Sequence, residues 1–333
     1  MRFLITGTAG FIGFHLARRL LASGHFVSGL DGMTPYYDVS LKRARHALLE
    51  RSDRFRAHEA MLEDWPSVRD IFAAERPEIV VHLAAQAGVR YSLKSPRAYL
   101  DANLVGGFNV MEAARTAAVG HFLLASTSSV YGADATTPFR ETDRADHPLT
   151  FYAATKKAAE DMAHAYAHLW KTPTTALRFF TVYGPWGRPD MALFKFVEAM
   201  LADEPIEIYG DGSALRDFTY IDDLVEAVVR LIDRPPREGQ RIAEMDSLSP
   251  VAPYRVVNIG GGRPISVLDL VAAVEQSLRR PAKRRFLDAQ KGDAPVTWAS
   301  SALLKALVGY APSTDVEDGV AQFVAWRRQY YGV

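Results

Sequence analysis

The sequence predicts an α/β fold, a doubly wound parallel sheet with a smaller, discontinuous C-terminal α/β lobe. Three observations predict it. Short apolar segments alternate with amphipathic helical patterns through the first half of the chain, as in a parallel sheet whose strands are joined by helices. The first of these segments runs directly into three glycines spaced three residues apart. The 333 residues, 48% of them hydrophobic, are enough for one large domain and a second lobe with its own core.

Apolar segments define the expected strands of the sheet: residues 3–6, 26–30, 79–83, 122–126 and 175–180. The intervals between them contain helical patterns, expected at residues 66–75, 99–118 and 152–170. A later apolar segment, residues 255–259, is expected to return to the sheet. The polar stretch between Pro235 and Pro253 is expected to be a surface loop.

The alternation of strands and helices loosens after Tyr183, where glycines and prolines at positions 184–189 predict a stiff loop. We therefore expect residues 1–183 to form the first domain, with return segments at about 217–233 and 254–262. The smaller lobe is expected to consist of residues 184–216 and about 263–333.

The three glycines that follow the first strand are Gly7, Gly10 and Gly13, and Phe11 and Ile12 lie between the last two. Gly7 permits a tight exit from the strand, Gly10 lets the backbone approach a pyrophosphate, and Gly13 lets the helix pack closely on the strand. The N–H groups at the start of that helix would then face the phosphates. This pattern indicates a dinucleotide site, with an ordinary strand-turn-helix junction as the alternative.

An acidic residue, Asp31, ends the second expected strand at about the separation where a carboxylate accepts the ribose hydroxyls of a bound dinucleotide. A carboxylate there repels a 2'-phosphate, and Gly32 supplies no opposite charge. Asp31 therefore favours NAD over NADP. The alternative is a surface turn formed by Asp31 and Gly32.

Composition and charge restrict the function further. The formal net charge of +0 argues against nucleic acid or an anionic membrane as the main partner. The absence of cysteine excludes disulfides, thiolate catalysis and cysteine metal sites, and the nine histidines show no zinc-site spacing, so no metal is expected. An apolar strand starts at residue 2 without a leader pattern, and no apolar stretch approaches the length of a membrane span. We therefore expect a soluble cytoplasmic protein.

Tyr152 and Lys156 are spaced i, i+4 at the start of an alanine-rich helical segment, so their side chains share one face. A neighbouring cation favours the phenolate, and Lys156 is therefore expected to lower the pKa of Tyr152 toward the range useful for acid-base catalysis. A hydroxyl-rich run, residues 126–132, leaves an expected strand at the carboxyl edge of the sheet, where ligands of open α/β sheets bind. A serine-rich turn that caps a helix is the alternative.

In this order, the glycine triplet, Asp31, the hydroxyl run and the Tyr152/Lys156 pair resemble the extended short-chain dehydrogenase/reductases that act on nucleotide sugars, and the resemblance covers essentially the whole chain. It implies a Rossmann fold and NAD as cofactor. It further implies a catalytic triad of Thr127, Tyr152 and Lys156, in which Tyr152 takes the proton from a sugar hydroxyl while hydride passes to NAD.

The resemblance also implies the reaction. Ser128 and Ser129 stand where related dehydratases and decarboxylases carry acidic residues, which indicates a 4-epimerase without an additional acid or base. The run from Arg178 to Phe194 is similar to the signature of UDP-glucuronate 4-epimerases, enzymes of polysaccharide biosynthesis, and Thr181 stands where UDP-galactose 4-epimerases have asparagine. Hydroxyls of Ser128, Ser129 and Thr181 could hold the C6 carboxylate of the sugar.

Further ligand contacts follow from the same resemblance. Leu83, Ala84 and Ala85 would line the cofactor. The other positions would contact the UDP-sugar: Arg90 near the sugar, Arg216 at the diphosphate, and Arg188 and Asp293 at the nucleotide or the sugar. An ordinary ion pair remains the alternative for each arginine.

Two other functions remain open. One is a 4-epimerase of neutral UDP-hexoses or UDP-N-acetylhexosamines, and the other is a sensor that binds NAD without catalysis. The resemblance further implies a homodimer that pairs the helices expected at residues 99–118 and 152–170, although their apolar stripes could equally be covered within one chain.

The sequence departs from the family pattern at Met61, where similar enzymes usually place an aspartate that hydrogen-bonds the adenine amino group. Adenine would then be held by packing against the thioether of Met61. We expect Met61→Asp not to weaken the retention of NAD.

Overall fold

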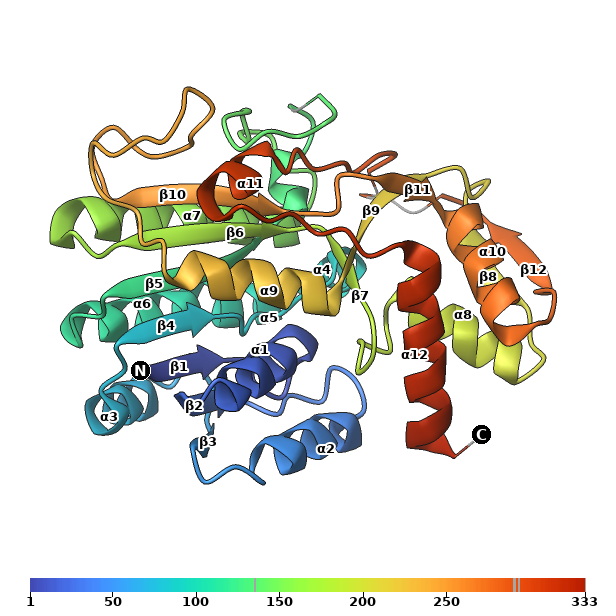
Figure 1. Cartoon of the computed structure of the whole chain (residues 1–333), viewed down its shortest axis with the longest axis horizontal. Coiled ribbons are helices and arrows are strands. Elements are labelled where there is room, and N and C mark those ends of the chain that lie inside the picture. Colours follow the sequence, from blue (N-terminus) through green and yellow to red (C-terminus); the bar gives the residue numbers. More distant parts are fainter. Residues whose placement is uncertain (135, 290–291, 293, 333) are drawn as a thin grey trace.

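The computed structural model describes residues 1–134, 136–289, 292 and 294–332, and its centre is a parallel sheet (Figure 1). Seven strands form it, in the order β10-β6-β5-β4-β1-β2-β3. All neighbouring pairs are parallel. The strands are β1 Arg2–Thr6, β2 Phe26–Asp31, β3 Phe55–Glu59, β4 Ile79–His82, β5 His121–Thr127, β6 Thr174–Phe179 and β10 Tyr254–Ile259. The order reverses at β1, between β2 and β4, which confirms the predicted doubly wound fold.

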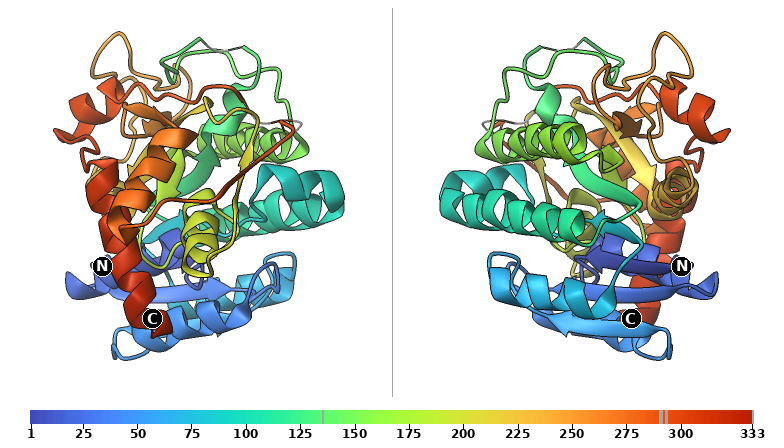
Figure 2. Two further views of the ribbon diagram at one scale, coloured as in Figure 1. Left: turned by 90° about the vertical axis from the view of Figure 1, so that its right-hand side faces the viewer. Right: turned by 90° about the vertical axis from the view of Figure 1, so that its left-hand side faces the viewer.

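Helices cover both faces of this sheet (Figures 1 and 2). One face carries α1 Phe11–Ala22, α2 Val39–Leu49, α9 Ile221–Ile232 and α11 Ala302–Val308, and the other carries α3 Trp65–Glu75, α6 Gly106–Thr116 and α7 Phe151–Trp170. Alternate residues of β1 point to opposite faces. Phe3 and Ile5 pack with Phe14 of α1, whereas Leu4 packs with Val110 of α6.

The remaining strands form two smaller sheets. One contains β11 Pro264–Ser266, β9 Leu215–Tyr220 and β7 Thr181–Tyr183, and the other pairs β12 Arg284–Leu287 with β8 Ile206–Tyr209. They lie with α8 Ala192–Leu201, α10 Val267–Leu278 and α12 Val316–Tyr331 at one end of the molecule (Figure 1). The α10 helix begins at a capping box between Ser266 and Asp269. The division into two domains at residue 183 stays a prediction.

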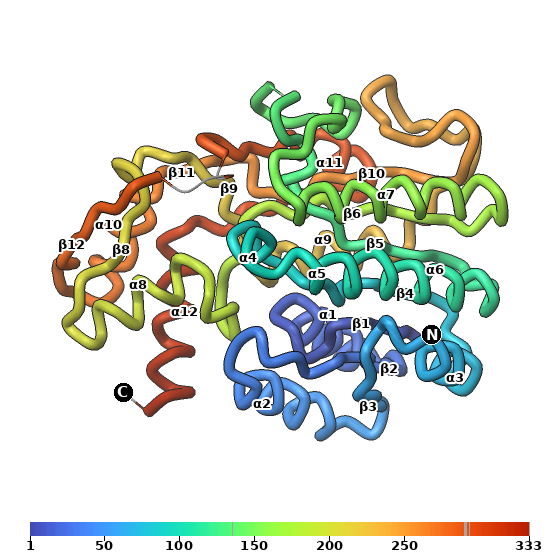
Figure 3. Tube along the Cα trace, turned by 180° about the vertical axis from the view of Figure 1, so that it is seen from behind, coloured from blue at the N-terminus to red at the C-terminus, as the bar shows by residue number. Residues whose placement is uncertain are grey.

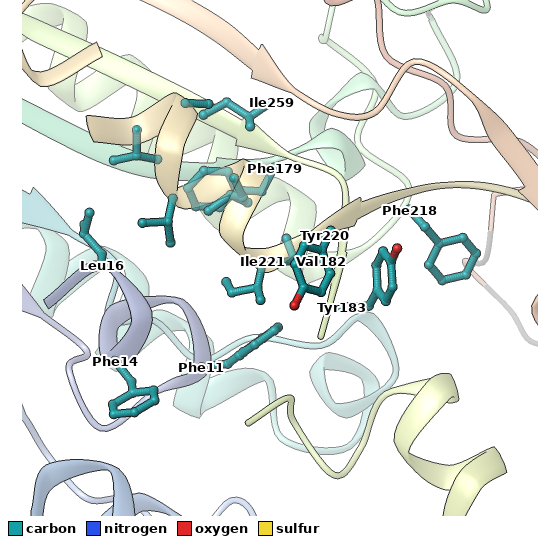
Figure 4. Packing of buried hydrophobic residues seen from close by; sticks show 14 of the residues in the cluster. Phe11, Phe14, Leu16, Phe179, Val182, Tyr183, Phe218, Tyr220, Ile221 and Ile259 are labelled. Carbon is teal, nitrogen blue, oxygen red and sulfur yellow. The ribbon is translucent and has the colours of Figure 1, made fainter. Parts of the chain in front are cut away.

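Apolar packing is continuous from the large sheet to the smaller sheets. Phe11 and Phe14 of α1 lie in one buried cluster with Val182 of β7 and Ile221 of α9 (Figure 4). The same cluster continues to Phe218 of β9. Because these residues form one continuous buried cluster, the chain segments that carry them pack directly together.

One expected element needs correction. The helix expected at 99–118 is three pieces: α5 Pro96–Tyr99, a π-helix Leu100–Val105, and α6. The polar stretch between α9 and β10 is a loop with many exposed residues, as expected. It is anchored to β10, because the fully buried carboxylate of Asp246 accepts hydrogen bonds from the Arg255 guanidinium at 2.8 and 3.0 Å. Within the described chain, no helix is both long enough and apolar enough to cross a membrane.

Candidate active site

The glycine loop between β1 and α1 has no space for side chains. Gly7 has a φ of +82°, which favours glycine, and a Cβ on it would lie 2.9 Å from the Ala84 nitrogen. A Cβ on Gly10 would lie 2.9 Å from the Gly7 carbonyl oxygen, and one on Gly13 only 2.1 Å from it. These distances explain the close packing of helix on strand that the sequence predicts.

The start of α1 is suited to an anion. Its cap residue, Gly10, has no side chain that could accept hydrogen bonds from the first backbone N–H groups of the helix. These N–H groups, at Phe11 and Ile12, carry the positive end of the helix dipole. The residues present therefore fit the pyrophosphate of a dinucleotide.

Asp31 lies at the carboxyl end of β2, beside this loop. Its buried carboxylate accepts hydrogen bonds from the backbone N–H of Ala9, at 3.0 Å, and of Met33, at 2.9 Å. A Cβ on Gly32 would approach the sulfur of Met61 to 2.5 Å, so Met61 covers the residue that follows Asp31. The structure thus brings Asp31 and Met61 together where the sequence places the adenosine end of the cofactor.

The segment after β4 lies opposite the glycine loop. The Thr6 hydroxyl oxygen accepts hydrogen bonds from the backbone N–H groups of Leu83, at 3.1 Å, and of Ala84, at 3.0 Å, and half-buried Ala85 follows. The same hydroxyl lies 2.7 Å from Nδ1 of His82. Burial lowers the pKa of His82 to about 3, so this histidine is neutral.

The helix α7 brings Tyr152 and Lys156 to the carboxyl edge of the sheet. Thr150 caps it, because its hydroxyl accepts a hydrogen bond from the Ala153 N–H at 3.1 Å. Tyr152 then stands in the first turn, where its phenol is near enough to Thr127, the last residue of β5, for the Thr127 hydroxyl to affect its pKa. The structure therefore places Thr127, Tyr152 and Lys156 around one edge of the sheet.

The pKa values in this group differ from the expectation. Burial raises the pKa of Tyr152, and the groups that oppose this rise are the Thr127 hydroxyl and the positive charge of Arg188. Burial lowers the pKa of Lys156 to about 8, while Glu160 acts in the opposite direction. The prediction that Lys156 by itself brings the pKa of Tyr152 down is therefore wrong, because both groups are desolvated in the same place.

The hydroxyl-rich segment continues from β5 into a short 3-10 helix, Ser128–Tyr131. Thr127 caps it by accepting a hydrogen bond from the Ser129 N–H at 3.2 Å, and Ser128 and Ser129 are half-buried. Thr181 starts β7, two residues after Phe179, which stands opposite Thr127 in the pairing of β5 with β6. The three predicted hydroxyl residues therefore follow closely after the ends of two neighbouring strands, β5 and β6.

The predicted arginines come from three different segments. Arg90, in α4 Val89–Lys94, lies with its guanidinium carbon 4.1 Å from the centre of the Tyr209 ring on β8. Arg188 is paired with Asp190, which also accepts a hydrogen bond from the Tyr36 hydroxyl at 3.1 Å.

One more predicted contact, Arg216, lies on the side of the smaller sheets. Arg216, on β9, donates hydrogen bonds to the carbonyls of Leu215 and Pro295 at 2.8 and 3.3 Å. Asp293 lies outside the described residues. Over the chain that the structure describes, no three His, Asp or Glu side chains are grouped so that they could hold a metal ion.

Residues 3–260, most of the chain, match the NAD dependent epimerase/dehydratase family. The chain belongs to this family. This epimerase/dehydratase is 60% identical over 334 aligned residues to a probable UDP-glucuronate 4-epimerase of Rhizobium meliloti (strain 1021), and the alignment covers 99% of the chain and 98% of the relative. It is 42% identical to UDP-glucuronate 4-epimerase 1 of Arabidopsis thaliana, with 99% of the chain and 77% of the relative covered.

A solved structure is similar over the full length. It is the crystal structure of UDP-glucuronic acid 4-epimerase from Bacillus cereus in complex with UDP-glucuronic acid and NAD, which matches with a TM-score of 0.89 and 32% identity. The match covers 99% of this epimerase/dehydratase and 100% of that chain. These findings confirm the predicted family, its fold and its cofactor, NAD. The roles of individual site residues stay predictions.

Asn103 lies beside the predicted site of this epimerase/dehydratase, and sequence reasoning missed it. Its side-chain amide accepts a hydrogen bond from the Gln86 N–H at 2.8 Å and donates to the Gln86 carbonyl at 3.1 Å. It also donates to the Thr155 hydroxyl at 3.0 Å, and Thr155 lies between Tyr152 and Lys156 on α7. Asn103 thereby ties the segment after β4 to the catalytic helix. The sequence offers no signal for Asn103, because the π-helix that contains it has no characteristic sequence pattern.

Proposed function

We propose that this epimerase/dehydratase interconverts UDP-glucuronate and UDP-galacturonate by inverting C4 of the sugar, with NAD as cofactor. The observation that carries the proposal is the placement of Thr127, at the end of β5, beside Tyr152 in the first turn of α7, at the edge of the sheet that also holds the glycine loop. The identity of 60% to a probable UDP-glucuronate 4-epimerase, over 99% of the chain, supports this substrate.

The residues at this edge of the sheet have different proposed roles in the reaction. Tyr152 takes the proton of the C4 hydroxyl and returns it to the same oxygen after the 4-keto sugar has turned over. Thr127 hydrogen-bonds that oxygen and orients it, and Lys156 holds the ribose next to the nicotinamide. Bound NAD supplies the acceptor for the C4 hydride, the donor that returns it to the opposite face, and a positive charge that favours the phenolate.

The proposed specificity for a uronate depends on hydroxyl groups. Ser128, Ser129 and Thr181 can donate hydrogen bonds to the C6 carboxylate. None of them holds the carboxylate in a bidentate ion pair, so the keto sugar keeps the freedom to rotate that inversion at C4 requires. Positions 128 and 129 carry no acid that could support dehydration or decarboxylation.

The remaining contacts are proposed for the nucleotide part. A guanidinium fork matches the geometry of phosphate oxygens, and Arg216 on β9 is proposed to face the diphosphate. Arg90 is proposed to lie near the sugar, and Arg188 and Asp293 at the nucleotide or the sugar. The contact of Arg90 with Tyr209 supports the proposed place of Arg90, because this contact joins α4 to the smaller sheets.

The decisive experiment mixes purified protein with UDP-glucuronate, without added NAD, and follows the sugar by proton NMR. We expect UDP-galacturonate to appear up to a stable equilibrium. Carbon dioxide and a pentose product would contradict the proposal in favour of decarboxylation. An inert spectrum with NAD present, together with turnover of neutral UDP-hexoses or UDP-N-acetylhexosamines, would move the assignment to those substrates.

We also propose that the protein is a homodimer formed through α6 and α7. The two helices lie side by side on one face of the molecule (Figure 3). Phe108 of α6 is 45% exposed and Trp170 of α7 is 46% exposed, and the Tyr166 ring lies between them, with centroid distances of 6.5 and 4.5 Å. An aromatic surface of this kind fits a second copy of itself across a two-fold axis.

A further inference from the structure

The side chain of Arg45, in α2, is fully buried, although arginine is almost never found there without a partner of opposite charge. Its four hydrogen bonds within the described chain all go to neutral oxygen atoms. Burying a guanidinium without a carboxylate is costly, so such a residue is expected to have a role that an apolar side chain could not fill.

The partners of Arg45 belong to two loops that are far apart in sequence. Nη1 donates to the Ala9 carbonyl at 2.7 Å, in the middle of the glycine loop, and to the Tyr37 hydroxyl at 2.7 Å. Nη2 donates to the carbonyls of Trp186 and Gly187 at 2.6 and 3.2 Å. One planar group therefore holds the dinucleotide loop and the loop after β7 at a fixed separation.

Both loops need this support. The Ala9 N–H is already bonded to Asp31, so Arg45 fixes the other side of the same residue. Trp186 has a φ of +60°, a left-handed conformation that is unfavourable for a tryptophan. Its ring packs against Phe14 of α1 with 5.4 Å between centroids, and its carbonyl is bonded to Arg45.

The loop that Arg45 holds leads directly to Arg188. Arg188 is paired with Asp190, and its positive charge lowers the pKa of Tyr152. A Cβ on Gly88, in the segment after β4, would lie 3.8 Å from Nη2 of Arg188, so this arginine lies beside the segment that the sequence assigns to the cofactor and the sugar. A shift of the Trp186 loop would therefore move Arg188 relative to the cofactor site.

We propose that Arg45 is a positioning residue that couples the dinucleotide loop to the Arg188 loop, so that NAD and the UDP-sugar each strengthen the binding of the other. The inference rests on the proposed function, because it assigns NAD to one loop and the UDP-sugar to the other. By linkage, the factor by which UDP tightens NAD equals the factor by which NAD tightens UDP.

The test is equilibrium dialysis of the protein with labelled NAD, with and without saturating UDP. Arg45→Met removes every donor and keeps an unbranched side chain, and Arg43→Gln is the matched control, since Arg43 lies on the same helix but pairs at the surface with Glu59. In the wild type and in Arg43→Gln we expect UDP to lower the Kd of NAD about tenfold. In Arg45→Met the Kd of NAD rises and the effect of UDP falls below about twofold.

An Arg45→Met protein that binds NAD weakly but still gains the full tightening from UDP would overturn the coupling, since a merely structural role predicts that result. If Arg45→Met does not fold, Arg45→Lys decides, because one ammonium cannot bridge both loops. In Arg45→Lys, the factor by which UDP lowers the Kd of NAD should be smaller than in the wild type. An unchanged factor overturns the inference. If the wild type epimerises its substrate but UDP does not change the Kd of NAD, only the inference is overturned. If the wild type binds no UDP, the proposed function is contradicted as well.

Discussion

At the scale of single residues, the proposed chemistry depends on Tyr152. Burial raises the pKa of its phenol, so the phenol is harder to ionise. The Thr127 hydroxyl and the Arg188 charge oppose that effect, and Lys156 is itself desolvated. In the protein without cofactor the phenol is therefore protonated at neutral pH.

Replacing Tyr152 with Phe removes the proposed base and leaves the ring, whose centroid lies 6.0 Å from that of Tyr99. We expect turnover to fall by about 10² to 10⁴, the usual contribution of a general acid-base group, with NAD retained. Turnover by NMR and the NAD content of the purified protein are measured. Tyr166→Phe is the control, because that hydroxyl donates to Glu112 elsewhere on α7 and its loss should leave turnover unchanged. Unchanged turnover in Tyr152→Phe would show that the base is another residue.

The adenine end gives a second prediction at this scale. Met61 covers Gly32 beside Asp31, and similar enzymes usually place an aspartate at this position. Met61→Asp should therefore retain NAD at least as well as the wild type, since the new carboxylate can accept a hydrogen bond from the adenine amino group. The NAD bound per chain after purification of both forms measures this, and a clear loss in the variant contradicts it.

At the scale of elements, apolar strands were predictable and half-exposed ones were not. The observed β1, β2, β4, β5, β6 and β10 begin and end within a residue or two of the segments expected from the sequence, because both faces of these strands are covered. The edge strand β3, Phe55–Glu59, shows no apolar run, since its side chains are partly exposed. The helix expected at 99–118 was wrong because the π turn around Asn103 depends on bonds to Gln86 and Thr155.

The loop between β5 and α7 carries the prediction for this scale. Glu141 of this loop accepts a hydrogen bond from the Asn258 N–H on β10 at 2.9 Å, and burial raises its pKa from 4.5 to about 7. Between these two values the folded protein binds a proton that the unfolded chain has lost, so stability falls as the pH rises. From the shift we expect a loss on the order of 3 kcal/mol between pH 4.5 and 7.

Glu141→Gln should abolish this dependence, because the amide keeps the acceptor and cannot ionise. Chemical denaturation at several pH values gives the free energy of unfolding. The free energy of unfolding of the variant, relative to that of the wild type, should increase as the pH rises to 7. Asp146→Asn, in an exposed part of the same loop, is the control and should follow the wild type. Parallel curves for wild type and Glu141→Gln would contradict the prediction, because they would show that Glu141 has the same pKa in the folded and unfolded states.

At the scale of the whole molecule, the prediction concerns the assembly. Phe108→Ser on α6 should weaken the proposed dimer, because it removes an aromatic anchor from the centre of the surface, where such residues dominate binding. Light scattering over a dilution series measures the dimer fraction. Phe26→Ser is the control, since Phe26 is 55% exposed at the start of β2 and far from α6. A wild type that is monomeric at all concentrations, or a dimer insensitive to Phe108→Ser, contradicts this interface.

The sequence by itself determined the fold class, the glycine cradle, the acid after β2, and the spacing of Tyr152 and Lys156. All of these are local patterns, because a strand, a turn and one helical turn each fit within a few consecutive residues. The tertiary structure alone decided how Asn103 and Arg45 join segments distant in sequence, and whether Tyr152 and Glu141 ionise easily. Such properties follow from long-range hydrogen bonds and from desolvation, which depend on what the whole fold places around a side chain.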